Sequence, residues 1–230
     1  MISVLQAAQR LQEAPPDGGG WATFASGAGL GSLQQVHEYV LPPDGARTWN
    51  SKGELLTYVR DGAVTCDTSV SLSSTEMQLV NHGLAPWHVH NRSKLESAHV
   101  FQLIFAPSTR FRGPSHSQRR FTMAERRAKW LLVASSDARE GGLHLLARAR
   151  VYSTLLGDGF HVVHPLASGR AAWLHVIDGE CTIGGHSRLH AGDAAAFINE
   201  RSVSITSRGD TELLLIEVAV TRSFRWNGSH

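Results

Sequence analysis

Short apolar runs separated by turn signals fill the chain from residue 33 to residue 105. The runs are rich in Val, Leu and aromatic residues, and turns such as Pro42–Gly45 and Asp61-Gly62 lie between them. Runs of this length, bounded in this way, predict β-strands rather than helices. The predicted strands are Gln35–Leu41, Glu54–Arg60, Ala63–Asp67, Glu76–Val80, Trp87–His90 and Val100–Phe105.

The same pattern returns after an interruption at residues 106–129. The interruption carries Pro, Ser and many Arg residues, and its end, Thr122–Lys129, predicts a short helix. Residues 1–31 show no clear period, and their start fits either a strand or a short helix. The second set of predicted strands is Trp130–Val133, Leu143–Ala147, Val151–Leu156, Gly159–Val163, Ala171–Ile177, Glu180–Ile183, Ala194–Ile198, Ser202–Thr206 and Glu212–Val218.

The two halves of the chain repeat one another. Tyr58–Val64 and His175–Cys181 both form a strand, an Asp-Gly turn and a strand, and an acidic turn follows each. A repeat of about 115 residues predicts two similar domains, and long helical patterns are absent, so the expected fold class is all-β with two barrels. The expected domains are an N-terminal barrel with its lead-in (1–106), a connector (107–129), a C-terminal barrel (130–222) and a tail (223–230).

Composition limits the partners of the protein. Charged residues make up 18% of the chain and the formal net charge is +2, which argues against direct nucleic-acid binding and membrane attraction. The N-terminus lacks a basic segment followed by a long apolar run, so we expect no signal peptide and no membrane span. Cys66 and Cys181 fit no zinc or CxxC spacing. Two isolated thiols are typical of a reducing compartment, and we expect a cytoplasmic protein.

Several motifs, taken in order and spacing, resemble those of the pirin-like family of the cupin superfamily. They are the lead-in residues Gly20, Trp21 and Phe24, and the runs Glu54–Val59, His99–Leu103, Gly113–Phe121, Leu132–Asp137 and Ala149–Tyr152. The resemblance extends over nearly the whole chain. It implies a bicupin, in which two jelly-roll-like barrels pack face to face.

The resemblance also implies one metal, usually iron, in the first barrel. Its ligands in the family are the two His of an H-P-H-R run and the His and Glu of an H-S-E run. Counted back from Glu54, the two His of the first run are replaced by Thr48 and Asn50. Counted on from Glu76, the second run keeps its His as His88 and replaces its Glu by His90. A tight iron site is therefore not expected, because Thr and Asn are weak, neutral ligands.

His88 and His90 are two residues apart on a predicted strand, so their side chains share one face. They could hold one divalent transition metal (iron as in the family, or zinc or nickel), with Asn50 or water completing the shell. They could equally line a wet pocket that holds no metal. In both cases Thr48 and Asn50 are expected to line the same pocket, and the neighbouring Trp49 and Trp87 are expected to narrow its mouth.

Other clusters of polar residues carry less information. The second-half histidines do not repeat the H-x-H pattern with a downstream His; they are His161, His164, His175, His186 and His190. We expect these to be scattered surface and core residues, and His99 to be packed or hydrogen-bonded. The basic stretch from Arg110 to Lys129 fits either a solvated connector or a patch for an acidic protein partner.

Two functions are compatible with this sequence. Some proteins of the resembled family cleave quercetin-type flavonols with O2, and the eukaryotic pirins are nuclear transcription cofactors. The first function is that of a small-molecule-binding or regulatory protein, with a small aromatic ligand and little or no dioxygenase activity. The second is that of a metal-dependent dioxygenase of the quercetin 2,3-dioxygenase type. O2 reacts slowly with closed-shell organic molecules unless an activator such as a redox metal is present, so the altered ligand positions favour the first.

Overall fold

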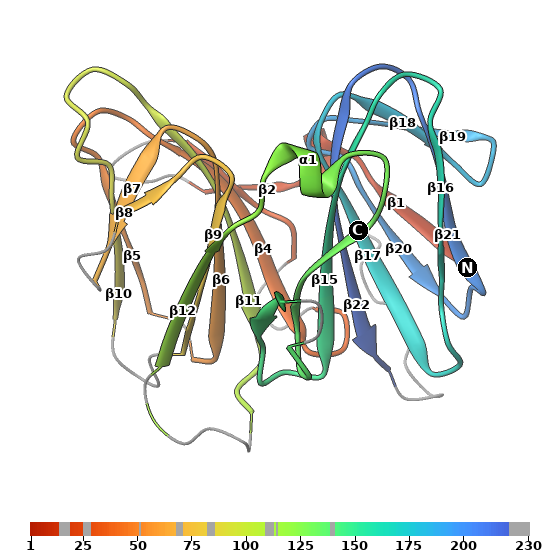
Figure 1. The fold of residues 1–230 in the computed structure, drawn as a ribbon, viewed down its shortest axis with the longest axis horizontal. Coiled ribbons are helices and arrows are strands. Elements are labelled where there is room, and N and C mark those ends of the chain that lie inside the picture. Colours follow the sequence, from red (N-terminus) through yellow and green to blue (C-terminus); the bar gives the residue numbers. More distant parts are fainter. Residues whose placement is uncertain are drawn as a thin grey trace.

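A computed structural model describes residues 1–13, 19–24, 29–50, 52–67, 71–81, 86–108, 113, 115–138 and 141–220. Its described residues are almost entirely strands and turns, arranged as two β-sandwiches that stand side by side (Figure 1). A 3-10 turn, η1 (Ala7–Gln9), and a single-turn helix, α1 (Met123–Arg126), interrupt the strands. The predicted all-β fold class is confirmed.

The first barrel is a sandwich of a seven-stranded and a four-stranded sheet. The larger sheet has the order β12-β9-β6-β11-β4-β3-β2 and the smaller one β5-β10-β7-β8. The strands of the larger sheet are β2 (Leu11–Glu13), β3 (Gly20–Ala22), β4 (Leu33–Leu41), β6 (Glu54–Asp61), β9 (Glu76–Asn81), β11 (Ala98–Phe105) and β12 (Ser115–Arg120). Those of the smaller sheet are β5 (Ala46–Trp49), β7 (Ala63–Cys66), β8 (Ser71–Ser73) and β10 (Trp87–His90).

The second barrel repeats this design with the orders β1-β20-β17-β22-β15-β13-β14 and β16-β21-β18-β19. Its larger sheet contains β1 (Ile2–Leu5), β13 (Leu131–Ser135), β14 (Leu143–His144), β15 (Ala149–Leu156), β17 (Arg170–Asp178), β20 (Ala194–Ile198) and β22 (Thr211–Ala219). Its smaller sheet contains β16 (His161–Pro165), β18 (Glu180–Ile183), β19 (Ser187–His190) and β21 (Ser202–Ser207). The repeat inferred from the two Asp-Gly hairpins thus corresponds to two similar sandwiches.

Three apolar cores hold the molecule together. One lies inside each barrel, and the third lies between the two seven-stranded sheets, where the barrels pack face to face. In the third core Trp173 is fully buried, and its ring centroid lies 4.7 Å from that of Phe24 in an edge-on arrangement. Each large side chain buried in this way contributes on the order of 1.5–3 kcal/mol, so this interface is a core in its own right.

Strand pairing departs from the expected domain boundaries at two places. The lead-in strand β1 pairs with β20 of the second barrel, and β12, from the expected connector, pairs with β9 of the first. Each of these two strands forms an edge of its large sheet and pairs with the backbone of β20 or β9. The N-terminal strand β1 therefore belongs to the second barrel, and β12 belongs to the first.

The expected helix Thr122–Lys129 is shorter in the structure. Thr122 caps its start with a capping box to Glu125, but Arg127 leaves the helix and bridges to Leu155. Ala128 has a positive φ of 59° and donates its N–H to the Leu155 carbonyl oxygen at 2.8 Å. Pairing with β15 therefore ends the helix after one turn. Among the described residues no helix is long and apolar enough to cross a membrane.

Part of the basic stretch pairs locally. Arg119 Nη2 lies 2.8 Å from Glu125 Oε1, and Arg120 Nε lies 3.8 Å from Glu76 Oε1. Arg126 is only 2% exposed. Arg110, Arg112 and the expected tail at residues 223–230 lie outside the described residues.

Candidate functional site

The two strands that carry the family's ligand positions are neighbours. β5 pairs antiparallel with β10, which puts Thr48 opposite His88 and Trp49 opposite Trp87. The register inferred by counting from Glu54 and Glu76 thus brings Thr48 and His88 together. Asn50 follows directly after the end of β5.

The faces of these strands differ from the expectation. Thr48, Asn50 and His88 are exposed and His90 is half-buried, whereas Trp49 and Trp87 are 7% and 4% exposed and join the core of the first barrel. Side chains alternate across a strand, so burying the two indoles directs their neighbours outward. The expectation that Thr48 and Asn50 line an interior pocket is wrong. The expectation that the two tryptophans narrow its mouth is wrong as well.

His88 and His90 therefore lie on the outer face of the smaller sheet. The Nδ1 of His88 lies 2.9 Å from Asp67 Oδ1, and the Nε2 of His90 lies 3.7 Å from Asp44 Oδ1. Within the described part of the chain, no group of three or more His, Cys, Asp or Glu side chains is placed to hold a metal ion. Metal binding by His88 and His90 stays a prediction.

The interior of the first barrel is packed with other groups. Buried Tyr39 donates to Gln102 Oε1 at 3.2 Å, and Gln102 donates to the Thr57 hydroxyl at 3.0 Å. The Trp49 ring lies under the Arg47 guanidinium, 4.4 Å from its centroid. Burial raises the pKa of the Cys66 thiol to about 12, so this side chain is a protonated core group rather than a thiolate ligand. One imidazole, His37, lies 4.4 Å from the Trp49 ring and 3.1 Å from Glu13 Oε1, but one imidazole does not make an iron centre with three imidazoles and a carboxylate.

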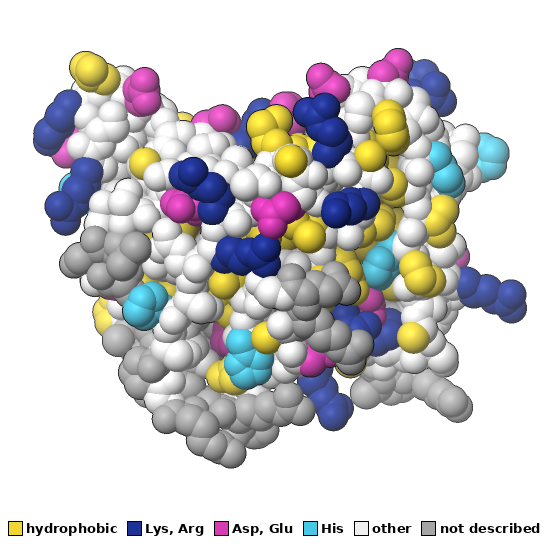
Figure 2. Space-filling model, viewed as in Figure 1, with side chains coloured by type: hydrophobic (Ala, Val, Ile, Leu, Met, Phe, Trp, Pro, Cys, Tyr) yellow, Lys and Arg dark blue, Asp and Glu magenta, His cyan; other side chains and the backbone are white. Residues whose placement is uncertain are grey.

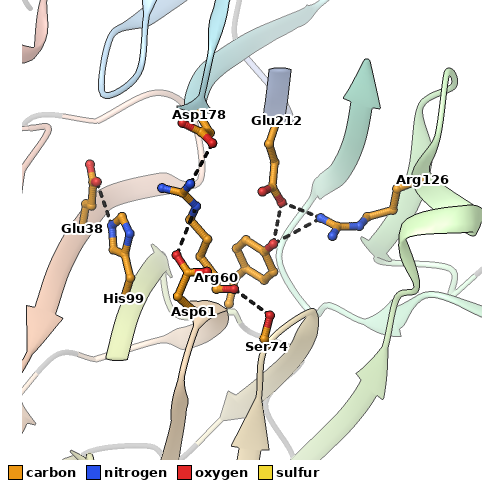
Figure 3. Close-up of polar contacts among 9 residues, drawn as sticks. Glu38, Arg60, Asp61, Ser74, His99, Arg126, Asp178 and Glu212 are labelled. Carbon is orange, nitrogen blue, oxygen red and sulfur yellow. Dashed lines mark hydrogen bonds and ion pairs between the residues drawn. The ribbon is translucent and has the colours of Figure 1, made fainter. Parts of the chain in front are cut away.

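A polar cluster lies instead where the two barrels meet. Glu38 of β4 accepts from His99 Nε2 at 2.8 Å and from Arg10, and His175 of β17 approaches it with Nε2 at 3.9 Å (Figure 3 shows the Glu38–His99 pair). Burial alone would raise the pKa of Glu38, but the His99 hydrogen bond, His175 and Arg10 lower it to about 2. His175 is fully buried, and neither of its ring nitrogens has a hydrogen-bond partner among the described residues.

A second polar cluster joins the connector to both barrels. Glu212 Oε1 accepts from Arg126 Nη1 at 2.6 Å and from the Tyr58 hydroxyl at 2.5 Å. Arg126 Nη1 also lies 3.2 Å from the Ser153 hydroxyl. Beside this cluster Arg60 of the first barrel bonds Asp178 of the second at 2.7 Å (Figure 3). Burial alone would lower the pKa of Arg126, and its pairing with Tyr58 and Glu212 raises it.

A third cluster lies at one end of the second barrel. Glu217 accepts from His164 Nε2 at 2.9 Å and from Arg170 Nε at 2.5 Å, and Arg150 lies at 3.5 Å. Burial opposes ionisation of Glu217, but His164 and Arg170 prevail and lower its pKa. His164 and His175 are core histidines, as the sequence allows, and each lies beside a carboxylate of another strand. No H-x-H spacing marks them, because their partners lie on other strands.

A pocket of about 450 Å³ opens between α1 and the second barrel, next to the second cluster. It lies away from β5 and β10, and none of the residues at the family's ligand positions lines it. Its walls come from α1, the β15–β16 turn, the end of β17 and the start of β22. Four separate segments build it, so no local sequence motif could have marked it.

Comparison with known proteins agrees with this architecture. Residues 132–218 match the family model of the quercetinase C-terminal cupin domain. The quercetin 2,3-dioxygenase of Escherichia coli K12 is 31% identical over 170 residues, covering 72% of this chain and 72% of that protein. A pirin-like protein of Caulobacter vibrioides is 27% identical over 175 residues, covering 74% and 75%.

A solved structure extends the likeness to the complete fold. The bacterial pirin YhhW from Escherichia coli, crystallised in complex with nickel(II), superposes with a TM-score of 0.86 at 27% identity. The match covers 96% of this chain and 100% of that one. Both sequence and fold agree, and the chain belongs to the pirin-like family of bicupin proteins.

Proposed function

We propose that this protein is a small-molecule-binding or regulatory member of its family, with little or no dioxygenase activity. The observation that supports it best is the burial of Trp49 and Trp87 in the core of the first barrel. The family's ligand positions are occupied here by Thr48 and His88, and both side chains are exposed on the outer face of the sheet. The interior beside Trp49 offers one imidazole, His37, and the carboxylate of Glu13, which is fewer ligands than the three imidazoles and a carboxylate of an iron centre.

A weak metal site on the surface is part of the same proposal. Asp67, as a carboxylate, can only accept, so the Nδ1 of His88 donates to it and the Nε2 lone pair is left for a metal. His90 supplies a second imidazole on the same face. Two imidazoles favour Zn2+ or Ni2+ over Mg2+ or Ca2+, which prefer oxygen ligands. The buried thiols of Cys66 and Cys181 are consistent with a cytoplasmic protein.

The second candidate is a metal-dependent dioxygenase acting on an aromatic compound. The name of the Escherichia coli relative, quercetin 2,3-dioxygenase, and the nickel in the YhhW crystal favour it. This candidate requires the first barrel to open, because Thr48, Asn50 and His88 do not form a ligand set in their present positions. Other residues would have to bind the metal.

Oxygen uptake separates the two candidates. The protein is loaded anaerobically with iron(II) or nickel(II), and O2 consumption is followed after quercetin is added. The Escherichia coli quercetin 2,3-dioxygenase is assayed in parallel as a positive control. We expect no uptake above that of the metal and quercetin alone. Metal-dependent turnover comparable to the control would overturn the proposal.

A further inference from the structure

The pocket between α1 and the second barrel has the dimensions of a small-ligand site. Its volume of about 450 Å³ lies within the range of roughly 300–1,000 Å³ that is typical of such sites. The residues that line it are Met123, Arg127, Ala128, Leu155, Leu156, Gly157, Phe160, Asp178, Asp210, Thr211 and Glu212.

Two large apolar side chains of the pocket are left in water. Met123 on α1 is 55% exposed and Phe160 in the β15–β16 turn is 50% exposed, whereas most large hydrophobic residues are buried. Hydrophobic side chains are visible on this face around α1 and along the second barrel (Figure 2). Covering exposed apolar surface is favourable by a free energy of about 25 cal/mol per Å². A ligand with an apolar body is therefore favoured between them.

The polar part of the lining consists mainly of carboxylates. Glu212 uses Oε1 for Arg126 and Tyr58, and Asp178 uses Oδ2 for Arg60. Asp210 is exposed and makes no hydrogen bond or ion pair within the described part of the chain. Carboxylates only accept hydrogen bonds, so the ligand must donate.

The balance of charge around the pocket is negative. Arg60 pairs with both Asp178 and Asp61, so these three side chains carry a net charge of −1. Arg126 pairs with Glu212, and their charges cancel. The excess charge and the free Asp210 disfavour an anion. Arg127 also lines the pocket and is exposed, but so is Asp210, and the lining carries three carboxylates (Asp178, Asp210 and Glu212) against this one guanidinium.

We infer that this pocket binds a small organic amine with an aromatic or other apolar body. The ammonium lies toward Asp210 and the free oxygen of Asp178, and the body lies between Met123 and Phe160. The inference rests on the proposed function, because it assigns a ligand class to a binding protein. The residues that line the pocket belong to the connector and the second barrel, so the inference can fail or hold independently of the oxygen-uptake result.

Three probes that share one indole ring test the inference. Tryptamine carries an ammonium, tryptophol a hydroxyl and indole-3-acetate a carboxylate, and their binding to the full chain is measured by calorimetry. We expect tryptamine to bind most tightly and indole-3-acetate to bind least. Substituting Phe160→Ala should weaken tryptamine about tenfold, because ring stacking and apolar contact are lost. Substituting Asp210→Asn should weaken it about three- to fivefold and leave tryptophol nearly unchanged.

Matched controls separate the site from general effects. Val163→Ala removes another half-exposed apolar side chain of the second barrel, and Glu96→Gln removes an exposed carboxylate of the first. Neither should change tryptamine binding, and thermal unfolding of each variant establishes that it is folded. The inference is overturned if tryptamine does not bind, if indole-3-acetate binds as tightly, or if the folded Phe160→Ala and Asp210→Asn variants bind tryptamine like the parent.

Discussion

Acid should weaken the packing between the two barrels through one residue, His175. Its imidazole is fully buried at the interface, faces the Phe101 ring at 5.6 Å, and has no hydrogen-bond partner among the described residues. Burial lowers the pKa of His175 from 6.5 to about 4, although the nearby Glu38 acts in the opposite direction. The folded protein therefore keeps this imidazole neutral at a pH where the unfolded chain protonates it.

The sign of the effect follows from this difference. Above a pH of about 6.5 the imidazole is neutral in both states and contributes no pH dependence. As the pH falls from about 6.5 toward 4, His175 is protonated in the unfolded state but stays neutral in the folded state, so the free energy of unfolding decreases. Each pKa unit is worth about 1.4 kcal/mol. The free energy of unfolding should therefore fall by about 2 kcal/mol between pH 7 and pH 5, and by about 3 kcal/mol once pH 4 is reached.

The carboxylates with lowered pKa values titrate in a lower window, and Glu54, whose pKa is raised by burial, is common to the parent and a His175 variant. Glu38 has a pKa lowered from 4.5 to about 2, so its stabilisation is present above pH 4.5 and is lost only below it. The lowered pKa of Glu217 has the same sign. Between about pH 7 and pH 5, the difference between the parent and a His175 variant isolates the imidazole.

The measurement is urea unfolding followed by tryptophan fluorescence at about pH 7, 6 and 5. His175→Leu removes the titrating ring and keeps an apolar side chain in the interface, so most of the pH dependence should disappear. His186→Gln removes an exposed imidazole from the β18–β19 turn and should leave the slope unchanged. Equal slopes for the parent and His175→Leu would mean that His175 does not cause the loss of stability in acid.

Three further predictions concern the first barrel and its connection to the second. Trp87→Ala should destabilise the protein by about 3–5 kcal/mol, whereas its exposed neighbour His88→Ala should cost less than about 0.5 kcal/mol; equal costs in chemical denaturation would mean that the faces of β10 are assigned wrongly. Arg126→Met removes the cation from the partly buried carboxylate of Glu212, which keeps the Tyr58 hydroxyl as a donor, and should cost about 1.5–3 kcal/mol, measured in the same way; a neutral result would contradict a stabilising role for the pair. Thr48→His adds an imidazole opposite His88 and should raise the affinity for Ni2+ in calorimetry without creating oxygen uptake with quercetin; unchanged affinity would argue against the register of β5 and β10.

Local sequence patterns were sufficient for most strands and for the two-barrel architecture. The Asp-Gly turns after Tyr58-Val59-Arg60 and after His175-Val176-Ile177 mark equivalent hairpins, and both occur in the structure. Long-range pairings were not predictable in this way. Nothing local in Ile2–Leu5 indicates that it joins the second barrel, because its partner β20 lies almost the whole chain away.

The candidate site shows a different limit. Counting from Glu54 and Glu76 placed Thr48 opposite His88 correctly, since register depends on spacing along the chain. The same residues were expected to face inward, because the family's ligands do. The structure buries Trp49 and Trp87 instead. Because side chains alternate across a strand, a shift of one residue exchanges all of its buried and exposed side chains. Motif spacing alone does not contain this information.

The metal content of the purified protein shows whether the first barrel can hold iron or nickel. The protein and the Escherichia coli quercetin 2,3-dioxygenase are produced in iron- and nickel-supplemented medium, dialysed without chelator, and analysed for metal by mass spectrometry. If Trp49 and Trp87 fill the first barrel, the protein should retain far less than one equivalent of either metal, and His88→Ala with His90→Ala should remove any residual Ni2+. One equivalent of iron or nickel per chain that persists in this double variant would mean that a ligand set inside the barrel holds the metal.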